Sequence, residues 1–284
     1  MRQRPPITRT DLVRDLKWLG VPPGALLMVH SSLRSLGEVD RGAESVVDAL
    51  LETLGPDGTL VVPTFTFATA RAPGFVFDPQ HTPSDMGAIT EAARRRPEAR
   101  RSVHIYHSIA ALGPLAEQLT TSGGDSAWDA ASPMGQVLDR DGWYLLLGVP
   151  YQTLTAVHVI EIRLGVWSRL ERVDEGRQRL PDGSVVPLFS RTHPRHQAHP
   201  GSDFNRAGQR MEDSGLVAIG EVGNAVARLF RAQDLLTTVA AMYATDRNAT
   251  LQQGPAVTAL AYGHTIPSPR GEYCVADPAR LFGT

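Results

Sequence analysis

Two side chains suited to acid–base chemistry, His158 and Glu161, lie three residues apart. They follow an apolar run from Trp143 to Val149, which is short, bounded by Asp-Gly and proline, and therefore predicts a buried strand. If the chain is helical from Thr155 onward, this spacing places imidazole and carboxylate on one face of a helix just beyond the strand. The pair could then transfer a proton, or it could be a solvated surface contact. A strand through the same residues would instead point His158 and Glu161 in opposite directions.

Strands and helices alternate along the first part of the chain. Apolar spacing predicts a helix from Thr10, as its N-cap, to Gly20, and a second helix over Gly42 to Leu54. Short apolar runs at Ala25 to Val29 and Gly58 to Pro63 predict buried strands. This strand–helix–strand order is typical of an α/β sheet, which places ligands outside the carboxyl ends of its strands.

Two stretches could bind an anion through backbone amides and hydroxyls. The segment His30–Gly37, read as a loop, places small hydroxyl side chains at the end of the first strand. Ser132 and Pro133 begin a helix expected over 134–138, with serine as cap and proline at the first position. For the segment His30–Gly37, the alternative is that its serines only cap the following turn.

The densest positive patch comprises Arg94, Arg95 and Arg96 together with Arg100 and Arg101. Such runs are usually solvated surfaces. Because this one precedes the polar stretch 102–108, an anionic ligand such as a nucleotide phosphate is a second interpretation.

Composition excludes several classes of protein. The chain has 284 residues, 42% hydrophobic and 20% charged, as is ordinary for a globular protein. A net charge of −2 argues against nucleic-acid or anionic-membrane binding, and no apolar run approaches the roughly 18 residues that span a bilayer. The N-terminus lacks an apolar segment typical of secretion, and the lone Cys274 offers neither a disulfide nor a thiolate cluster. We therefore expect a cytoplasmic protein.

Common cofactor signatures are missing from the sequence. It contains no G-x-G-x-x-G after a strand, no Walker loop and no G-x-S-x-G elbow. His193, His196 and His199 recur every third residue, but nearby prolines and the lack of helical pattern argue against a fixed metal geometry. We therefore expect no metal site.

The remaining chain predicts further elements and no internal repeat. Pro181-Asp-Gly-Ser184 indicates a hairpin turn, and a last helix is expected over 232–243. Irregular loops are predicted at 65–84 and 189–203. From about 247 the periodicity fades, so we expect one domain over 1–284 that ends in an irregular tail packed on its surface.

An ordered set of motifs resembles the aminoglycoside 3-N-acetyltransferase family over roughly residues 10 to 245. The motifs are His30-Ser-Ser-Leu-Arg-Ser-Leu-Gly37, Gly58-Thr-Leu-Val-Val-Pro-Thr64, Phe77-Asp-Pro, Thr82-Pro-Ser-x-Met-Gly87, Arg101-Ser-x-His104-x-x-His-Ser108-x-Ala-Ala-x-Gly113, Ser132-Pro133, Leu145-Leu-Leu-Gly-Val149, His158-x-x-Glu161 and Val222-Gly-Asn-Ala-x-Ala-Arg-Leu-Phe230. No single motif is decisive, but their order is highly specific.

The resemblance implies a three-layer α/β/α fold with a central mixed sheet, unrelated to the GNAT fold of the common N-acetyltransferases. It implies an enzyme that transfers the acetyl group of acetyl-coenzyme A to an amine of an aminoglycoside antibiotic. His158 would be the general base and Glu161 its partner. The residues expected along the cofactor are His30, Ser31, Ser32, Leu33, Arg34, Ser35, Arg101, Ser102, His104, His107, Ser108, Ser132 and Pro133.

An imidazole with a pKa of about 6.5 can accept the proton that an attacking amine must lose. Thr155, one turn before the histidine, is our candidate donor to the developing oxyanion. Aminoglycosides carry ammonium groups, so carboxylates should line the acceptor site, and much of the acidic surface will be ordinary surface charge. The residues expected at the acceptor site are Glu161, Asp129, Tyr106 and Asp203.

Three positions depart from the family pattern: Ile105 replaces a usual proline, Asp129 a frequent glycine before Ser-Pro, and Arg41 a frequent glycine. Other interpretations remain open: acyl transfer to another amine of secondary metabolism, a coenzyme A binding protein without catalysis, and a metal-dependent hydrolase. The expected partners are small molecules, with no nucleic acid and no membrane, and the protein is expected to be a monomer or homodimer.

Overall fold

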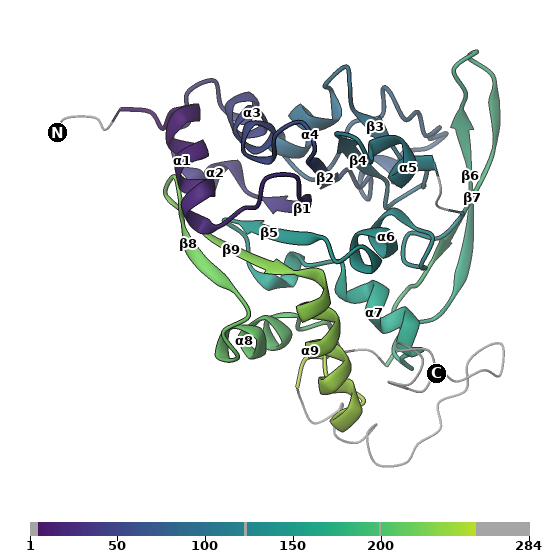
Figure 1. Ribbon diagram of the computed structural model, residues 1–284. Helices are drawn as coiled ribbons and strands as arrows, with labels where there is room; N and C mark the ends of the chain where they lie inside the picture. Colours follow the sequence, from purple (N-terminus) through teal and green to yellow (C-terminus); the bar gives the residue numbers. More distant parts are fainter. Residues whose placement is uncertain (1–4, 122–123, 199, 254–284) are drawn as a thin grey trace.

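The computed structural model describes residues 5–121, 124–198 and 200–253 (Figure 1). The helices are α1 Arg9–Leu19, α2 Leu33–Leu36, α3 Ala43–Leu54, α4 Ala88–Arg94, α5 Ala116–Thr121, α6 Pro133–Asp139, α7 Val157–Leu164, α8 Asn205–Asp213 and α9 Ala232–Thr245. The strands are β1 Leu26–Ser31, β2 Thr59–Pro63, β3 Arg100–Arg101, β4 Ile109–Leu112, β5 Trp143–Leu147, β6 Arg172–Arg179, β7 Val185–Thr192, β8 Ala218–Val222 and β9 Ala225–Arg231. Single 3₁₀ turns occur at Thr69–Arg71 and Tyr151–Thr153.

A seven-stranded mixed sheet with the order β3-β4-β2-β1-β5-β9-β8 forms the centre of the fold. Strand β1 runs parallel to β2 and β5, and the outer strands pair antiparallel. The carboxyl ends of β1, β2 and β5 therefore lie at one edge. The loop between β3 and β4 reaches the same edge, because Ile109 at the start of β4 pairs with Pro63 at the end of β2.

The sheet is covered on both faces (Figure 1). In β1, Leu27 and Val29 join one buried cluster with α1, α3 and α4, whereas Leu26 and Met28 join another with α6, α7 and α9. This alternation follows from the two-residue period of a strand. It confirms the predicted three-layer α/β/α fold with a mixed central sheet.

Strands β6 and β7 form a separate two-stranded ribbon, labelled at the right of Figure 1. Their turn contains Asp182-Gly183, and the backbone N–H of Leu180 donates to the carbonyl of Ser184, so the predicted hairpin turn is confirmed. The predicted loop over 189–203 is wrong at its start, because β7 continues to Thr192 in register with β6. Leu188 packs with Phe77 and Ile105.

Three further sequence predictions need correction. Helix α1 is capped by Thr8 instead of Thr10, through a capping box with Asp11. The segment 30–37 was expected to be a loop but contains the short helix α2. The tail does not begin on the surface, because residues 248–251 are buried, and Thr250 is 0% exposed. Cys274 and the rest of the tail lie outside the described residues.

In the part of the chain that the structure describes, we find no helix with the length and apolar character needed to cross a membrane.

Candidate active site

The predicted pair lies on helix α7. The 3₁₀ turn Tyr151–Thr153 connects β5 to this helix, and Gly165 ends it in the left-handed conformation at φ 63°. His158 Nδ1 lies 2.7 Å from Glu161 Oε2. The helical interpretation is therefore right, and the alternative strand is wrong.

Glu161 is a buried carboxylate whose two oxygens both make polar contacts. Its side chain is 0% exposed. Oε2 also accepts from Nε of Arg169 at 3.0 Å. Oε1 accepts from Oγ1 of Thr250 at 2.5 Å and from the hydroxyl of Tyr243 at 3.4 Å. Such saturation allows a charged carboxylate to remain inside a protein.

These contacts set the protonation of the pair. Burial alone would raise the pKa of Glu161, but Arg169 and the hydrogen bonds from His158 and Thr250 outweigh it and lower that pKa to about 2. Burial and the charge of Arg169 lower the pKa of His158, against the opposite effect of Glu161. At neutral pH the carboxylate is therefore ionised and the imidazole neutral, as a general base requires.

Aromatic side chains enclose the imidazole and leave 20% of the His158 side chain exposed. The rings of Trp128 and Phe204 each lie 5.1 Å from it, edge to face. Trp128 also contacts His107, at 4.8 Å between ring centres. A continuous row of rings therefore joins the catalytic candidate to the β3–β4 loop.

His104 fixes that loop. Its Nδ1 accepts from the backbone N–H groups of Tyr106 and His107, both at 3.0 Å, and its Nε2 lies 3.4 Å from the carbonyl of Arg191. Burial lowers the pKa of His104 to about 4. The ring is therefore neutral and ties the loop to the hairpin.

His107 and His193 belong to the same neighbourhood. Burial, followed by the nearby His104, His158 and His193, lowers the pKa of His107 well below its usual range. Burial and Arg191 lower the pKa of His193 to about 4. The buried Nδ1 atoms of both rings have no hydrogen-bond partner within the described chain.

The hydroxyl-rich segment lies at the carboxyl ends of β1 and β5. Ser32 N donates to the carbonyl of Leu147 at 3.0 Å, and Ser35 Oγ donates to the carbonyl of Gly148 at 2.9 Å. Gly148 has φ +72°, and a Cβ built there would meet the Cβ of Ser35 at 2.5 Å. Glycine is therefore required for this close approach.

Other members of the segment have different surroundings. His30 is 5% exposed, and burial lowers its pKa to about 4. Ser31 Oγ is buried without a partner in the described structure, whereas Ser32 caps α2. Leu33 is half-buried, and Arg34 is exposed.

Arg101 is directed into the protein. Its Nη2 donates to the carbonyl of Thr64 at 2.8 Å, its Nη1 to the carbonyl of Thr82, and its Nε lies 3.1 Å from Ser108 Oγ. Burial lowers the pKa of this guanidinium to about 9. Ser102 Oγ accepts from the backbone N–H of Ile109 at 2.9 Å. These residues tie the strand ends and the β3–β4 loop together.

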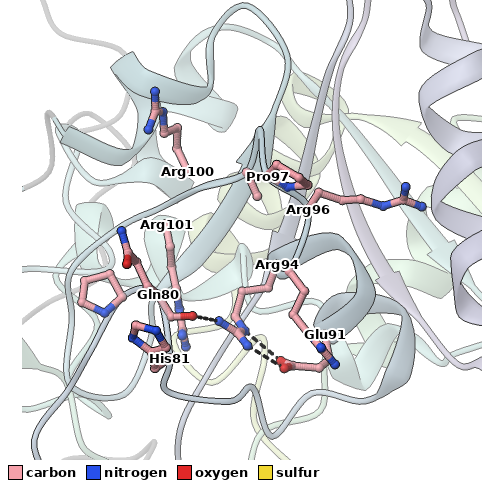
Figure 2. Close-up of a pocket in the computed structure, with 11 residues that line it drawn as sticks. Gln80, His81, Glu91, Arg94, Arg96, Pro97, Arg100 and Arg101 are labelled. Atoms are coloured by element: carbon pink, nitrogen blue, oxygen red, sulfur yellow. Dashed lines mark hydrogen bonds and ion pairs between the residues drawn. The ribbon is translucent and has the colours of Figure 1, made fainter. Parts of the chain in front are cut away.

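The other predicted arginines line a cavity of about 720 Å³ on the α4 side (Figure 2). Arg94 forms two bonds with Glu91, at 2.6 and 2.8 Å, and a third with the carbonyl of Gln80. Arg96 pairs with Asp48 at 2.7 Å, and Figure 2 shows Arg96 and Arg100 directed away from Arg94. Arg94 and Arg96 are therefore each paired with a carboxylate of the protein.

Ser132 and Pro133 begin α6 as predicted, and Ser132 Oγ accepts from Gly135 N at 3.0 Å. Asp129 Oδ1 accepts from the backbone N–H of Ser132 at 2.7 Å, so this carboxylate stabilises the turn that precedes α6. Thr155 Oγ1 lies 3.9 Å from Met134 Sδ.

The two remaining acceptor-site candidates differ in their position. Tyr106 is half-buried, 6.3 Å from the His107 ring. Asp203 is half-buried and precedes Phe204, which contacts His158.

Sequence reasoning missed several side chains that complete the site. They are Trp128, Arg169, Phe204, Tyr243 and Thr250. None has a periodic or motif-like relation to His158. Trp128 and Phe204 contact His158, whereas Arg169, Tyr243 and Thr250 contact Glu161.

Comparison with known proteins identifies the family. The sequence profile described as aminoglycoside 3-N-acetyltransferase matches residues 28–244. The chain belongs to the aminoglycoside 3-N-acetyltransferase family.

It is 33% identical to aminoglycoside N(3)-acetyltransferase IV of Salmonella sp over 237 residues, 81% of this chain and 85% of that one. It is also 33% identical to aminoglycoside N(3)-acetyltransferase VIII of Streptomyces fradiae, over 81% of this chain and 90% of that relative. Members of this family are acyltransferases, and this chain is an enzyme of that class.

Solved structures of the family share the fold. The apoenzyme of AAC(3)-IVa is 29% identical to this chain. The two superpose with a TM-score of 0.74 over 99% of each chain. A variant of AAC(3)-IVa solved with a gentamicin gives a TM-score of 0.75 at 30% identity, over 89% of this chain and 94% of that one. AAC-IIIb, solved with CoASH, gives a TM-score of 0.73 at 24% identity, over 87% of this chain and 99% of that one.

Two departures from the family pattern now have a structural setting. Arg41 adopts φ 55°, a conformation that favours glycine and explains why glycine is frequent there. Ile105 is buried against the hairpin, where a Cβ built on Gly176 would lie 2.8 Å from its Cδ1.

The histidine run does not form a metal cluster within the described structure. His196 stacks edge to face on Trp167, with ring centres 5.8 Å apart, and its Nδ1 accepts from Ala198 N. No group of three potential ligands is found among the described residues, and His199 lies outside them.

Proposed function

We propose that this enzyme transfers the acetyl group of acetyl-coenzyme A to the 3-amino group of 2-deoxystreptamine aminoglycosides, with His158 as the general base. The observation that carries this proposal is the 2.7 Å contact between His158 and the buried Glu161 in a partly exposed aromatic site. Nδ1 faces the carboxylate, and Nε2 has no hydrogen-bond partner among the described residues. That nitrogen is therefore available to an incoming amine.

The proposed reaction is direct. The neutral amine attacks the thioester carbonyl while His158 accepts its proton, and Glu161 stabilises the imidazolium that forms. The tetrahedral adduct then expels the coenzyme A thiolate, which takes up a proton. Thr155 remains our candidate donor to the oxyanion. The serine-rich segment 31–35 at the strand ends and the N-terminus of α6 would hold the cofactor.

A second acceptor class is favoured by one observation. Asp129 is hydrogen-bonded to the backbone of Ser132, so fewer carboxylates are free to bind a polycationic drug than the sequence suggested. Acyl transfer to another amine of secondary metabolism, with the same base, is therefore the alternative.

The first experiment is a thiol-release assay with acetyl-coenzyme A and gentamicin, kanamycin or unrelated amines, followed by NMR of the product. We expect acetylation at the 3-amino group. Acetylation of only the unrelated amines would replace the aminoglycoside assignment with the alternative. Absence of thiol release with every amine would overturn the proposed activity.

The base assignment is tested by His158→Ala. We expect turnover to fall by at least about a hundredfold, because proton transfer typically contributes this much or more. Coenzyme A binding, measured by calorimetry, should change little. The matched control is His81→Ala, which removes an exposed histidine and should retain wild-type turnover. Wild-type turnover in His158→Ala would contradict the assignment.

A further inference from the structure

Arg169 contacts Glu161, the carboxylate that pairs with His158. It follows α7 on the chain, and its side chain is 7% exposed. Nε donates to Glu161 Oε2 at 3.0 Å, and Nη2 donates to Ser202 Oγ at 3.0 Å. Two separate segments therefore fix its guanidinium.

The arginine and the histidine share one carboxylate oxygen. Oε2 of Glu161 receives both His158 Nδ1 and Arg169 Nε, while Thr250 and Tyr243 take the other oxygen. A single negative charge therefore faces one permanent cation and one group that can become a cation. Protonation of His158 would place two positive charges on one buried carboxylate, which Coulomb repulsion opposes.

We infer that Arg169 is a positioning residue that fixes the carboxylate that orients His158 and, in addition to burial, keeps this imidazole neutral at working pH. The effect of Arg169 on catalysis rests on the proposed function. Its effect on the protonation of His158 is independent of that function, because it is a property of the protein without substrate.

The other charged or titratable groups near the ring do not supply the same effect. Arg195 is exposed, and its influence on His158 is weaker than that of Arg169 or Glu161. His107 and His193 have lowered pKa values, chiefly because of burial, and remain neutral at working pH. The pKa of Tyr243 is raised well above its usual range by burial and Glu161, so it stays an uncharged donor. After burial, Arg169 is therefore the group that most strongly lowers the pKa of His158, against the opposite effect of Glu161.

The test is an NMR titration of the full chain with ¹³C-labelled histidine, in which His158→Ala assigns the signal. We expect wild-type His158 to titrate below its ordinary value of 6.5. In Arg169→Gln, which keeps an N–H donor and removes the charge, the titration should move to higher pH. The acidic limb of the pH–rate profile should move in the same direction.

Two variants separate charge from structure. Arg169→Lys retains the charge and should titrate close to wild type. Arg172→Gln makes the same charge change at an exposed position and should leave His158 unchanged. An unchanged titration in folded Arg169→Gln would overturn the inference, as would an equal shift in Arg169→Lys.

The wild-type protein alone can also overturn the inference. If Arg169→Gln does not fold, wild-type titration above 6.5 remains sufficient to reject it. If no amine is acetylated but the titrations move as expected, the proposed function fails and the assignment of Arg169 stands.

Discussion

At the scale of single residues, His158 and Glu161 form an unsymmetrical pair. The pKa of the imidazole is lowered by burial and Arg169, and that of the carboxylate is lowered to about 2 despite burial. Both groups are therefore poised in the forms that general-base catalysis uses. Titratable groups with pKa values perturbed in this way are typical of acid–base sites.

Replacing Glu161 by glutamine tests the charge with little change of shape. Arg169 would lose its buried counterion, so we expect the free energy of unfolding to fall by roughly 3–5 kcal/mol. The imidazolium would lose its stabilising charge, so kcat should fall about a hundredfold or more. Urea denaturation and steady-state kinetics measure the two effects. Glu175→Gln, on the exposed face of the hairpin, is the control, and equal behaviour of the two variants would contradict this role.

At the scale of elements, the site is closed by the C-terminal part of the described chain. Helix α9 contributes Tyr243, and the turn after it contributes Thr250, whose hydroxyls lie 2.6 Å apart. The same turn is held by the backbone bond from Asp203 N to the carbonyl of Thr250 at 2.7 Å. The start of the tail is therefore part of the site as well as of the core.

Thr250→Val removes one hydroxyl while keeping the side-chain shape. We expect the loss of a buried bond to a carboxylate to cost about 1.5–3 kcal/mol of unfolding free energy. The orientation of Glu161 should also suffer, so kcat should fall several-fold. Thermal unfolding and kinetics provide the measurements. Thr245→Val is matched in chemistry but lies on the exposed end of α9, and both quantities should stay near wild type there. A Thr250→Val enzyme with wild-type kcat would show that this contact has no part in the site.

At the scale of the whole molecule, buried neutral histidines make the fold sensitive to acid. Burial lowers the pKa values of His30 and His104 to about 4, whereas an unfolded histidine titrates at about 6.5. Below 6.5 the unfolded chain binds protons that the folded chain does not. Stability is therefore full above 6.5 and is lost as the pH falls from 6.5 to 4. The ionised Glu161 also contributes stability, which is lost as the pH falls from 4.5 to about 2.

Urea denaturation at pH 7 and pH 5 tests this dependence. Each of the two histidines can remove up to about 3 kcal/mol by pH 4, so the midpoint should already be lower at pH 5. His30→Leu should lose less stability on acidification than wild type. His81→Gln, at an exposed position, should show the full wild-type loss. Equal midpoints at pH 7 and pH 5 in the wild type would exclude this account.

Elements with local signals could be predicted from the amino-acid order alone. Apolar periodicity and turn residues predicted β1, α3, β2, β5 and α9 within a few residues. The spacing of His158 and Glu161 placed the pair on one helical face. The order of strands and helices indicated an α/β sheet, and the resemblance to the family implied the three-layer fold. The predicted elements and the placement of the pair depend on neighbours within about one helical turn or on a strand's two-residue period.

The surroundings of the pair, in contrast, depend on how the folded chain packs. Arg169, Thr250 and Phe204 reach His158 or Glu161 from segments with no periodic relation to α7, so no local pattern could reveal them. The sequence left the arginine run open as a solvated surface or an anion site, but Arg101 turns inward and Arg94 pairs with Glu91. The physical reason is that a side chain's partners are set by packing between distant segments, whereas a helix or strand is set by its own residues.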